Sequence, residues 1–159
     1  MKAEYVNAFV ESTINAMQTM TMISPQRKDV KIKKEGESAT FDISGLIGIA
    51  GEAVGSVILS FPEDTAVKVV SNFIGEEIPE VNRDVLDAIG ELTNIVAGGA
   101  KKIFSEQGYH FKISIPNVVH GKDHKINRPK DVPTIVVTFS SDAGPFAVEV
   151  SLKMGPKPA

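Results

Sequence analysis

Residues 84–106 read DVLDAIGELTNIVAGGAKKIFSE, and this stretch predicts one long amphipathic helix around which the rest of the chain is organised. Apolar residues recur at every third or fourth position, which is typical of a helix with one buried side. These residues are Val85, Ile89, Leu92, Val96 and Ile103. With a turn of about 100° per residue, a second set falls together on the opposite side. We call this set the outer face: Asp87, Glu91, Asn94 and Gly98.

Two residues of the outer face have a clear chemical capacity. Glu91 and Asn94 are three positions apart, so their side chains are neighbours on the helix surface. A carboxamide both donates and accepts hydrogen bonds and can orient one water, while a carboxylate can pair with an ammonium group. The ExxN pattern by itself also occurs on solvated helix faces, so its setting must decide its meaning.

Three glycines interrupt the predicted helix. Each of Gly90, Gly98 and Gly99 costs about 1 kcal/mol relative to alanine in a helix interior. We therefore expect close backbone packing, or a partner surface, at these positions.

Composition limits the classes of protein to which the chain can belong. A length of 159 residues with 42% hydrophobic residues predicts a single domain over 1–159. The net charge of −3 argues against nucleic-acid binding. No apolar run is long enough to span a bilayer, and the N-terminus, MKAEYVNAFVES, is unlike a signal peptide. With no cysteine, the chain fits a reducing compartment, and we expect a cytoplasmic protein.

The remaining patterns predict an α+β fold with a mainly antiparallel sheet. The expected order is one helix, three strands, two helices and three strands, in two halves with a coarse symmetry. Residues 116–133 are predicted as a proline-rich loop and 154–159 as a frayed tail. Helices are expected at 4–22, 62–75 and 84–106, and strands at 29–34, 39–50, 53–61, 110–115, 134–139 and 146–152.

Other motifs give weaker signals. Glycines at 45, 48, 51 and 55 do not follow the GxGxxG spacing, which favours strand bulges and a hairpin turn over a nucleotide site. The basic run at 27–34 is interpreted as a solvated strand face. His120, Asp123 and His124 lie in a loop without fixed spacing, so we interpret them as solvated residues in preference to a metal site.

The stretch AIGELTNIVAGGAKK (88–102) closely resembles the signature helix of the CheC/CheX/FliY family of chemotaxis phosphatases. FPEDTAVKVVSNFIG (61–75) and IPNVVHGKDHKI (115–126) are similar to the CheX branch, and the resemblance covers nearly the whole chain. Relatives with two active helices also carry ExxN in the first helix. Here Glu11 is followed three positions later by Ile14, and Asn15 is one position out of phase, which implies a single site.

The resemblance implies a function and a set of roles. The substrate would be a phosphorylated receiver domain such as CheY, with Asn94 orienting the attacking water and Glu91 pairing with the receiver's lysine. Gly98 would let the receiver's backbone come close, and helix angles suggest that Asp87 and Lys101 border the contact.

Cofactor and assembly follow from the same resemblance. The protein would need no cofactor of its own, since the receiver supplies Mg²⁺, and it would form a homodimer through its sheet. The alternative is a receiver-binding or dimerisation module without catalysis.

Overall fold

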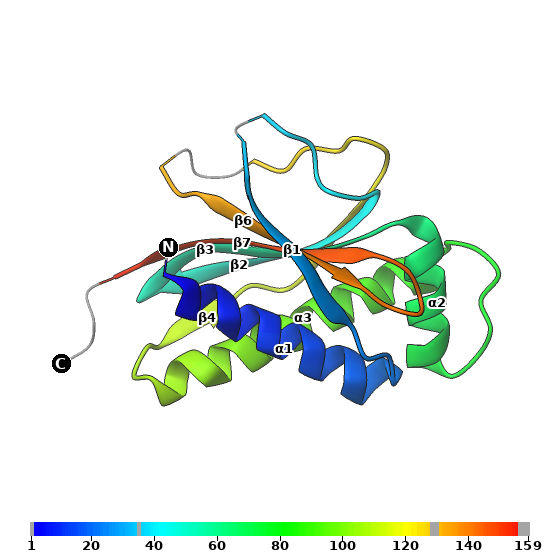
Figure 1. Cartoon of the computed structure of the whole chain (residues 1–159), viewed down its shortest axis with the longest axis horizontal. Coiled ribbons are helices and arrows are strands. Elements are labelled where there is room, and N and C mark those ends of the chain that lie inside the picture. Colours follow the sequence, from blue (N-terminus) through cyan, green and yellow to red (C-terminus); the bar gives the residue numbers. More distant parts are fainter. Residues whose placement is uncertain (1, 35, 128–130, 156–159) are drawn as a thin grey trace.

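The computed structural model describes residues 2–34, 36–127 and 131–155. Figure 1 shows α1 and α3 beneath a single sheet, with α2 at one end of the molecule. The elements follow in the order α1 (Ala3–Thr21), β1 (Gln26–Lys33), β2 (Ile43–Gly51), β3 (Ala53–Phe61), α2 (Glu63–Ile74), α3 (Arg83–Glu106), β4 (Phe111–Ile113), β5 (Asn117–His120), β6 (Thr134–Ser140) and β7 (Phe146–Met154).

The described strands form one antiparallel sheet whose order reflects the two halves of the chain. The order is β1-β6-β7-β3-β2-β4, and β5 pairs with β2 on the same side as β4. The last strands of the two halves, β3 and β7, pair at the centre, and β2 and β6 flank them. The first strands lie at the two edges. The predicted symmetry is therefore present in the sheet, and it makes α1 and α3 equivalent helices.

The second half contains one strand more than predicted. The order of one helix, three strands and two helices is confirmed, but four strands follow in place of three. The strand predicted at 110–115 ends at Ile113, and β5 lies inside the segment predicted as a loop. Pro116 separates the two short strands because it has no N–H to donate to the sheet. The start of β2 also differs from the prediction: the strand begins at Ile43, four residues later than predicted.

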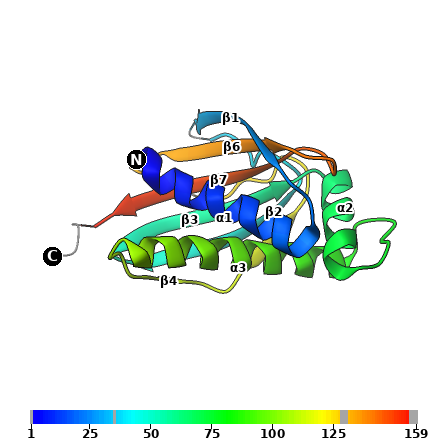
Figure 2. The same cartoon turned by 60° about the horizontal axis from the view of Figure 1, so that its bottom comes forward.

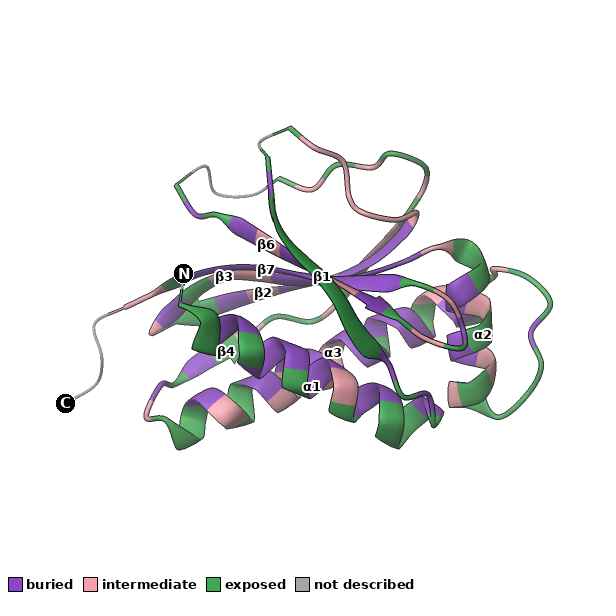
Figure 3. Ribbon diagram, in the orientation of Figure 1, coloured by how far each residue is buried: buried purple, intermediate pink, exposed green. Residues whose placement is uncertain are grey.

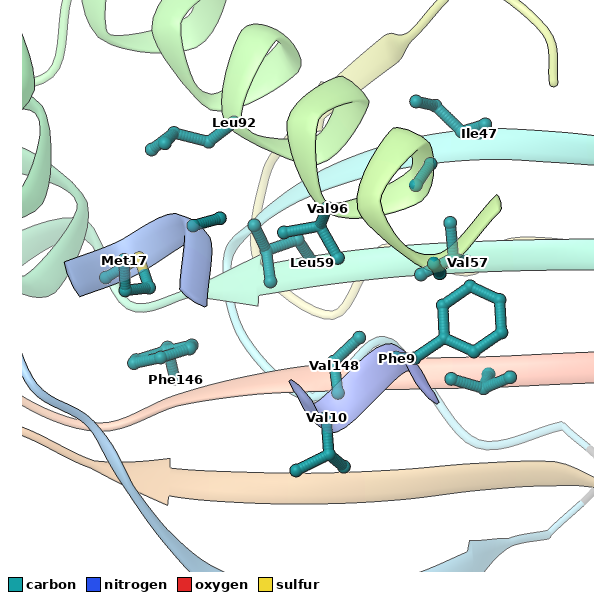
Figure 4. Packing of buried hydrophobic residues seen from close by; sticks show 14 of the residues in the cluster. Phe9, Val10, Met17, Ile47, Val57, Leu59, Leu92, Val96, Phe146 and Val148 are labelled. Carbon is teal, nitrogen blue, oxygen red and sulfur yellow. The ribbon is translucent and has the colours of Figure 1, made fainter. Parts of the chain in front are cut away.

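One apolar core lies between the two long helices and the sheet (Figure 4). Burying each large apolar side chain contributes roughly 1.5–3 kcal/mol to stability. Most core positions of α3 are those that the helical period predicted, but Ile103 is only half-buried and Phe104 is buried instead. α1 supplies a matching stripe. At most 1% of the surface remains exposed for Phe9, Met17, Leu59, Leu92, Val96 and Val148.

The opposite face of the sheet carries a buried ion pair. Figure 1 shows loops above this face. Lys33 Nζ lies 3.0 Å from Glu149 Oε1, and their side chains are only 3% and 0% exposed. The Thr40 amide and hydroxyl donate to Glu149 Oε2, which secures the loop after β1. β1 is otherwise exposed, as predicted for the basic run (Figure 3). The prediction was wrong for Lys33, which is buried because Glu149 balances its charge.

Specific contacts define the ends of α3 and β7. The Asn82 side chain accepts a hydrogen bond of 3.0 Å from the Val85 amide and caps α3. Met154, predicted to fray, ends β7 and pairs with Ala53. The rest of the predicted tail beyond Gly155 lies outside the described residues. Among the helices that the structure describes, none has the length and apolar character needed to cross a membrane.

Candidate functional site

The outer face of α3 points away from the core. Asp87, Glu91 and Lys101 are exposed, and Asn94 and Gly98 are half-exposed. The buried side of the same helix, which includes Val85, Ile89, Leu92 and Val96, packs into the core. The structure therefore brings the five predicted site residues together on one accessible side of one helix.

The two polar groups of the ExxN pair have no partner within the described part of the chain. Neither the Glu91 carboxylate nor the Asn94 carboxamide takes part in a hydrogen bond or an ion pair there. Their hydrogen-bonding capacity is therefore available to a molecule that approaches from outside.

Two of the three glycines in α3 are explained by packing within the chain. A Cβ at Gly99 would collide with the Ser12 hydroxyl of α1. A Cβ at Gly90 would lie 3.7 Å from Pro116 and closer still to Val118. These glycines let α1 and the β4–β5 linker, residues 114–116, lie directly against α3.

Gly98 differs from the other two. A Cβ at this position would meet nothing within 4 Å. Packing in the described structure gives no reason for a glycine that costs about 1 kcal/mol in a helix. A bare backbone on the outer face, one turn from Asn94, instead permits the close approach of another molecule.

Buried hydroxyls fix the position of α3 behind the outer face. Ser12 Oγ donates a hydrogen bond of 2.6 Å to the Val96 carbonyl oxygen, joining α1 to α3. Thr93, which is buried, donates to the Ile89 carbonyl oxygen at 2.7 Å and packs against Gly45 of β2. Contacts to both α1 and the sheet therefore hold the segment that carries Glu91 and Asn94, which fixes the backbone from which the two side chains project.

A groove between α1 and α3 runs beside the outer face. It is lined by Ile95, Gly99 and Lys102 of α3 and by Glu11 and Asn15 of α1 among others, but by neither residue of the ExxN pair. Glu11 and Asn15 of α1 thus line a groove between the helices, while Glu91 and Asn94 of α3 lie outside it.

The loop histidines have separate partners. His120 Nε2 lies 2.7 Å from Glu63 Oε1, at the start of α2. His124 Nε2 lies 2.8 Å from the Ser44 hydroxyl, and its Nδ1 lies 2.9 Å from the Gly121 carbonyl oxygen. Over residues 2–34, 36–127 and 131–155, no group of three or more His, Asp or Glu side chains is placed to hold a metal ion.

Comparison with known proteins identifies the family. The profile of a family described as chemotaxis phosphatase CheX matches residues 43–140. The chain is 32% identical to the CheY-P phosphatase CheX of Thermotoga maritima, over 98% of this chain and 99% of that protein. The chain belongs to the CheX family. This confirms the resemblance inferred from the α3 sequence.

Solved structures of the CheX family have the same fold. The chemotaxis protein CheX of Vibrio vulnificus matches with a TM-score of 0.86 and 38% identity, over 95% of this chain and 100% of that chain. The CheX of a CheX-CheY-BeF3-Mg+2 complex from Borrelia burgdorferi matches with a TM-score of 0.80 over 96% of this chain and 99% of that chain. At 23% identity the second likeness shows the fold alone.

Sequence reasoning missed the residues that support the site. Ser12 and Thr93 are buried hydroxyls whose only signal is a polar residue within an apolar stripe. Pro116 and Val118 were assigned to a loop, although they contact Gly90. These contacts join segments far apart in sequence, so no local pattern reveals them.

Proposed function

We propose that this protein hydrolyses the aspartyl phosphate of a CheY-like receiver domain, with Glu91 and Asn94 as its catalytic residues. The phosphatase class follows from membership of the CheX family. The observation that carries the assignment of residues is an adjacent carboxylate and carboxamide, both unpartnered and accessible on a helix that is rigidly held.

The reaction needs little equipment from this chain. An acyl phosphate is already electrophilic, so a phosphatase mainly has to place one water in line with the bond that breaks. The Asn94 carboxamide orients this water. The oxygen of the water forms a bond to phosphorus while the bond between phosphorus and the aspartyl carboxyl oxygen breaks. Inorganic phosphate leaves with one proton of the water, the other proton passes to solvent, and the receiver keeps a free aspartate carboxylate.

The remaining roles concern the receiver. The Glu91 carboxylate pairs with a lysine of the receiver and fixes its orientation. Gly98 admits the receiver's backbone, and Asp87 and Lys101 border the contact. Magnesium belongs to the receiver, where it balances the charge of the phosphoryl group. The naming of CheY and Mg+2 together in the Borrelia burgdorferi complex supports this division.

The proposal is tested by mixing the protein with each phosphorylated receiver domain of its host and following phosphate loss. We expect one receiver or more to lose phosphate at least tenfold faster than it does spontaneously. Binding without acceleration would instead make the protein a non-catalytic receiver-binding module. Absence of both binding and acceleration for every receiver would reject the proposed partner class.

We also propose that the protein is a homodimer and acts in the cytoplasm, where its receivers would be. The edge strand β1 supports a contact through the sheet, because Val30 and Ile32 are 49% and 66% exposed there. Light scattering of the purified protein should give twice the mass of one chain. A monomer at micromolar concentration would contradict the dimer.

A further inference from the structure

Ile115 is an apolar side chain that the protein leaves in solvent beside its proposed catalytic helix. It is 80% exposed, although the neighbouring Phe111 and Ile113 pack into the core. It lies in the β4–β5 linker, which begins where β4 ends and runs alongside α3 (Figure 2).

The linker holds Ile115 in a fixed position. The Ser114 amide donates to the Gly48 carbonyl oxygen at 2.9 Å, and the Gly48 amide donates back to Ser114 Oγ at 2.9 Å. The same hydroxyl donates to the Ile115 carbonyl oxygen at 2.9 Å. Pro116, the next residue, restricts the backbone of Ile115 to extended conformations. Ordering the backbone of this segment on binding therefore costs little entropy, and the β-branched side chain of Ile115 has few χ1 rotamers to lose.

Gly90 brings the linker to the border of the outer face. A Cβ added at Gly90 would lie 3.2 Å from Val118 and 3.7 Å from Pro116, so both residues pack directly against this glycine. On the helix surface, Gly90 is the neighbour of Asp87, three positions before it, and of Asn94, four positions after it. A protein that reaches Asn94 from outside consequently meets the β4–β5 linker at the same time.

The outer face alone is too small to hold a protein partner. From Asp87 to Lys101 it is about 21 Å long and one side chain wide, on the order of 200 Å². A stable protein interface needs about 800 Å² from each partner and an apolar anchor near its centre. The outer face offers a carboxylate, a carboxamide and a bare glycine, so the anchor must come from a neighbouring element.

We propose that Ile115 is an apolar anchor for the receiver domain, which covers it when its aspartyl phosphate reaches Asn94. This inference rests on the proposed function, because the same receiver domain contacts both Ile115 and Asn94. Ile115 contributes affinity for the receiver and takes no part in the chemistry.

The test compares Ile115→Ala with Val54→Ala, a matched truncation of a 52% exposed side chain on β3. The receiver is the one that the protein dephosphorylates or, if none is dephosphorylated, the one that it binds. Its affinity for each variant is measured after the receiver is loaded with Mg²⁺ and beryllofluoride, a stable analogue of the phosphoryl group. We expect Ile115→Ala to raise Kd and KM about tenfold while kcat stays within about twofold, and Val54→Ala to change none of them.

A Kd for the Ile115→Ala protein within twofold of wild type would overturn the inference. The binding measurement does not depend on catalysis, so it is interpretable even if no receiver is dephosphorylated. A tenfold loss of binding by Ile115→Ala without any phosphatase activity would reject the proposed function and retain the anchor. An unchanged melting temperature of the variant shows that its fold is intact.

Discussion

Helices α1 and α3 are equivalent in the two halves of the molecule, yet they present different chemistry. On α3, Glu91 and Asn94 stand three positions apart and both are accessible. On α1, the residue three positions after Glu11 is Ile14, which packs against the core. The next residue, Asn15, lines the groove between the helices. Spacing decides whether a glutamate and an asparagine present their polar groups together, and of these two helices α3 alone has the required separation.

The packing of the two helices reinforces this difference. Ser12 of α1 holds the backbone of α3 by donating a hydrogen bond to the Val96 carbonyl oxygen. α3 in turn carries a glycine, Gly99, that lets α1 approach. α1 therefore supports α3, and α3 presents the proposed site.

Replacing each glutamate separately tests the difference between the two helices, and a large effect is expected on α3 alone. We expect Glu91→Ala to lower kcat/KM for the phosphorylated receiver by about 100-fold, since it removes a charged contact that positions the reacting groups. Glu11→Ala, on the equivalent helix, should change kcat/KM by less than about twofold. Equal losses in the two variants, measured by phosphate release, would mean that both helices contribute to catalysis.

A smaller effect is expected from Gly99→Ala. Its new methyl group overlaps Ser12 Oγ, so we expect the free energy of unfolding to fall by about 2 kcal/mol. Denaturant titration measures this loss. If the two residues are in contact, Gly99→Ala combined with Ser12→Ala should be less destabilising than the sum of the single changes. Simple additivity would show that the two helices are not in contact there.

The adjacent glycine should respond in the opposite direction. Gly98→Ala meets open space, and we expect it to raise the free energy of unfolding by about 1 kcal/mol through helix propensity. The same change should weaken receiver binding several-fold, because the methyl group occupies the place of the approaching backbone. A variant that is more stable and binds the receiver as tightly as wild type would remove Gly98 from the contact.

The sequence predicted α3 and its outer face well because both depend on local periodicity. The stripe that includes Val85 and Leu92 is buried as expected, and Glu91 lies opposite to it. The ExxN pair was recognisable for the same reason: two residues on one helix have a fixed separation, whatever the rest of the chain does.

Features set by distant contacts were not predictable from the sequence. β5 exists because it pairs with residues 43–46 of β2, more than 70 positions away. Lys33 is buried because Glu149, on β7, lies within reach of it. In the same way, Gly99 faces α1, Gly90 faces the β4–β5 linker and Gly98 faces open space. Only the structure distinguishes these three glycines.

Asn94 of α3 is proposed to direct the water that attacks the acyl phosphate. The rate of phosphate loss from the receiver, measured with Asn94→Ala and with Asn15→Ala on α1, tests this role. We expect Asn94→Ala to bind the receiver but to lose about 100-fold or more of the acceleration, while Asn15→Ala keeps it. Hydrolysis by Asn94→Ala at the wild-type rate would exclude this role for Asn94.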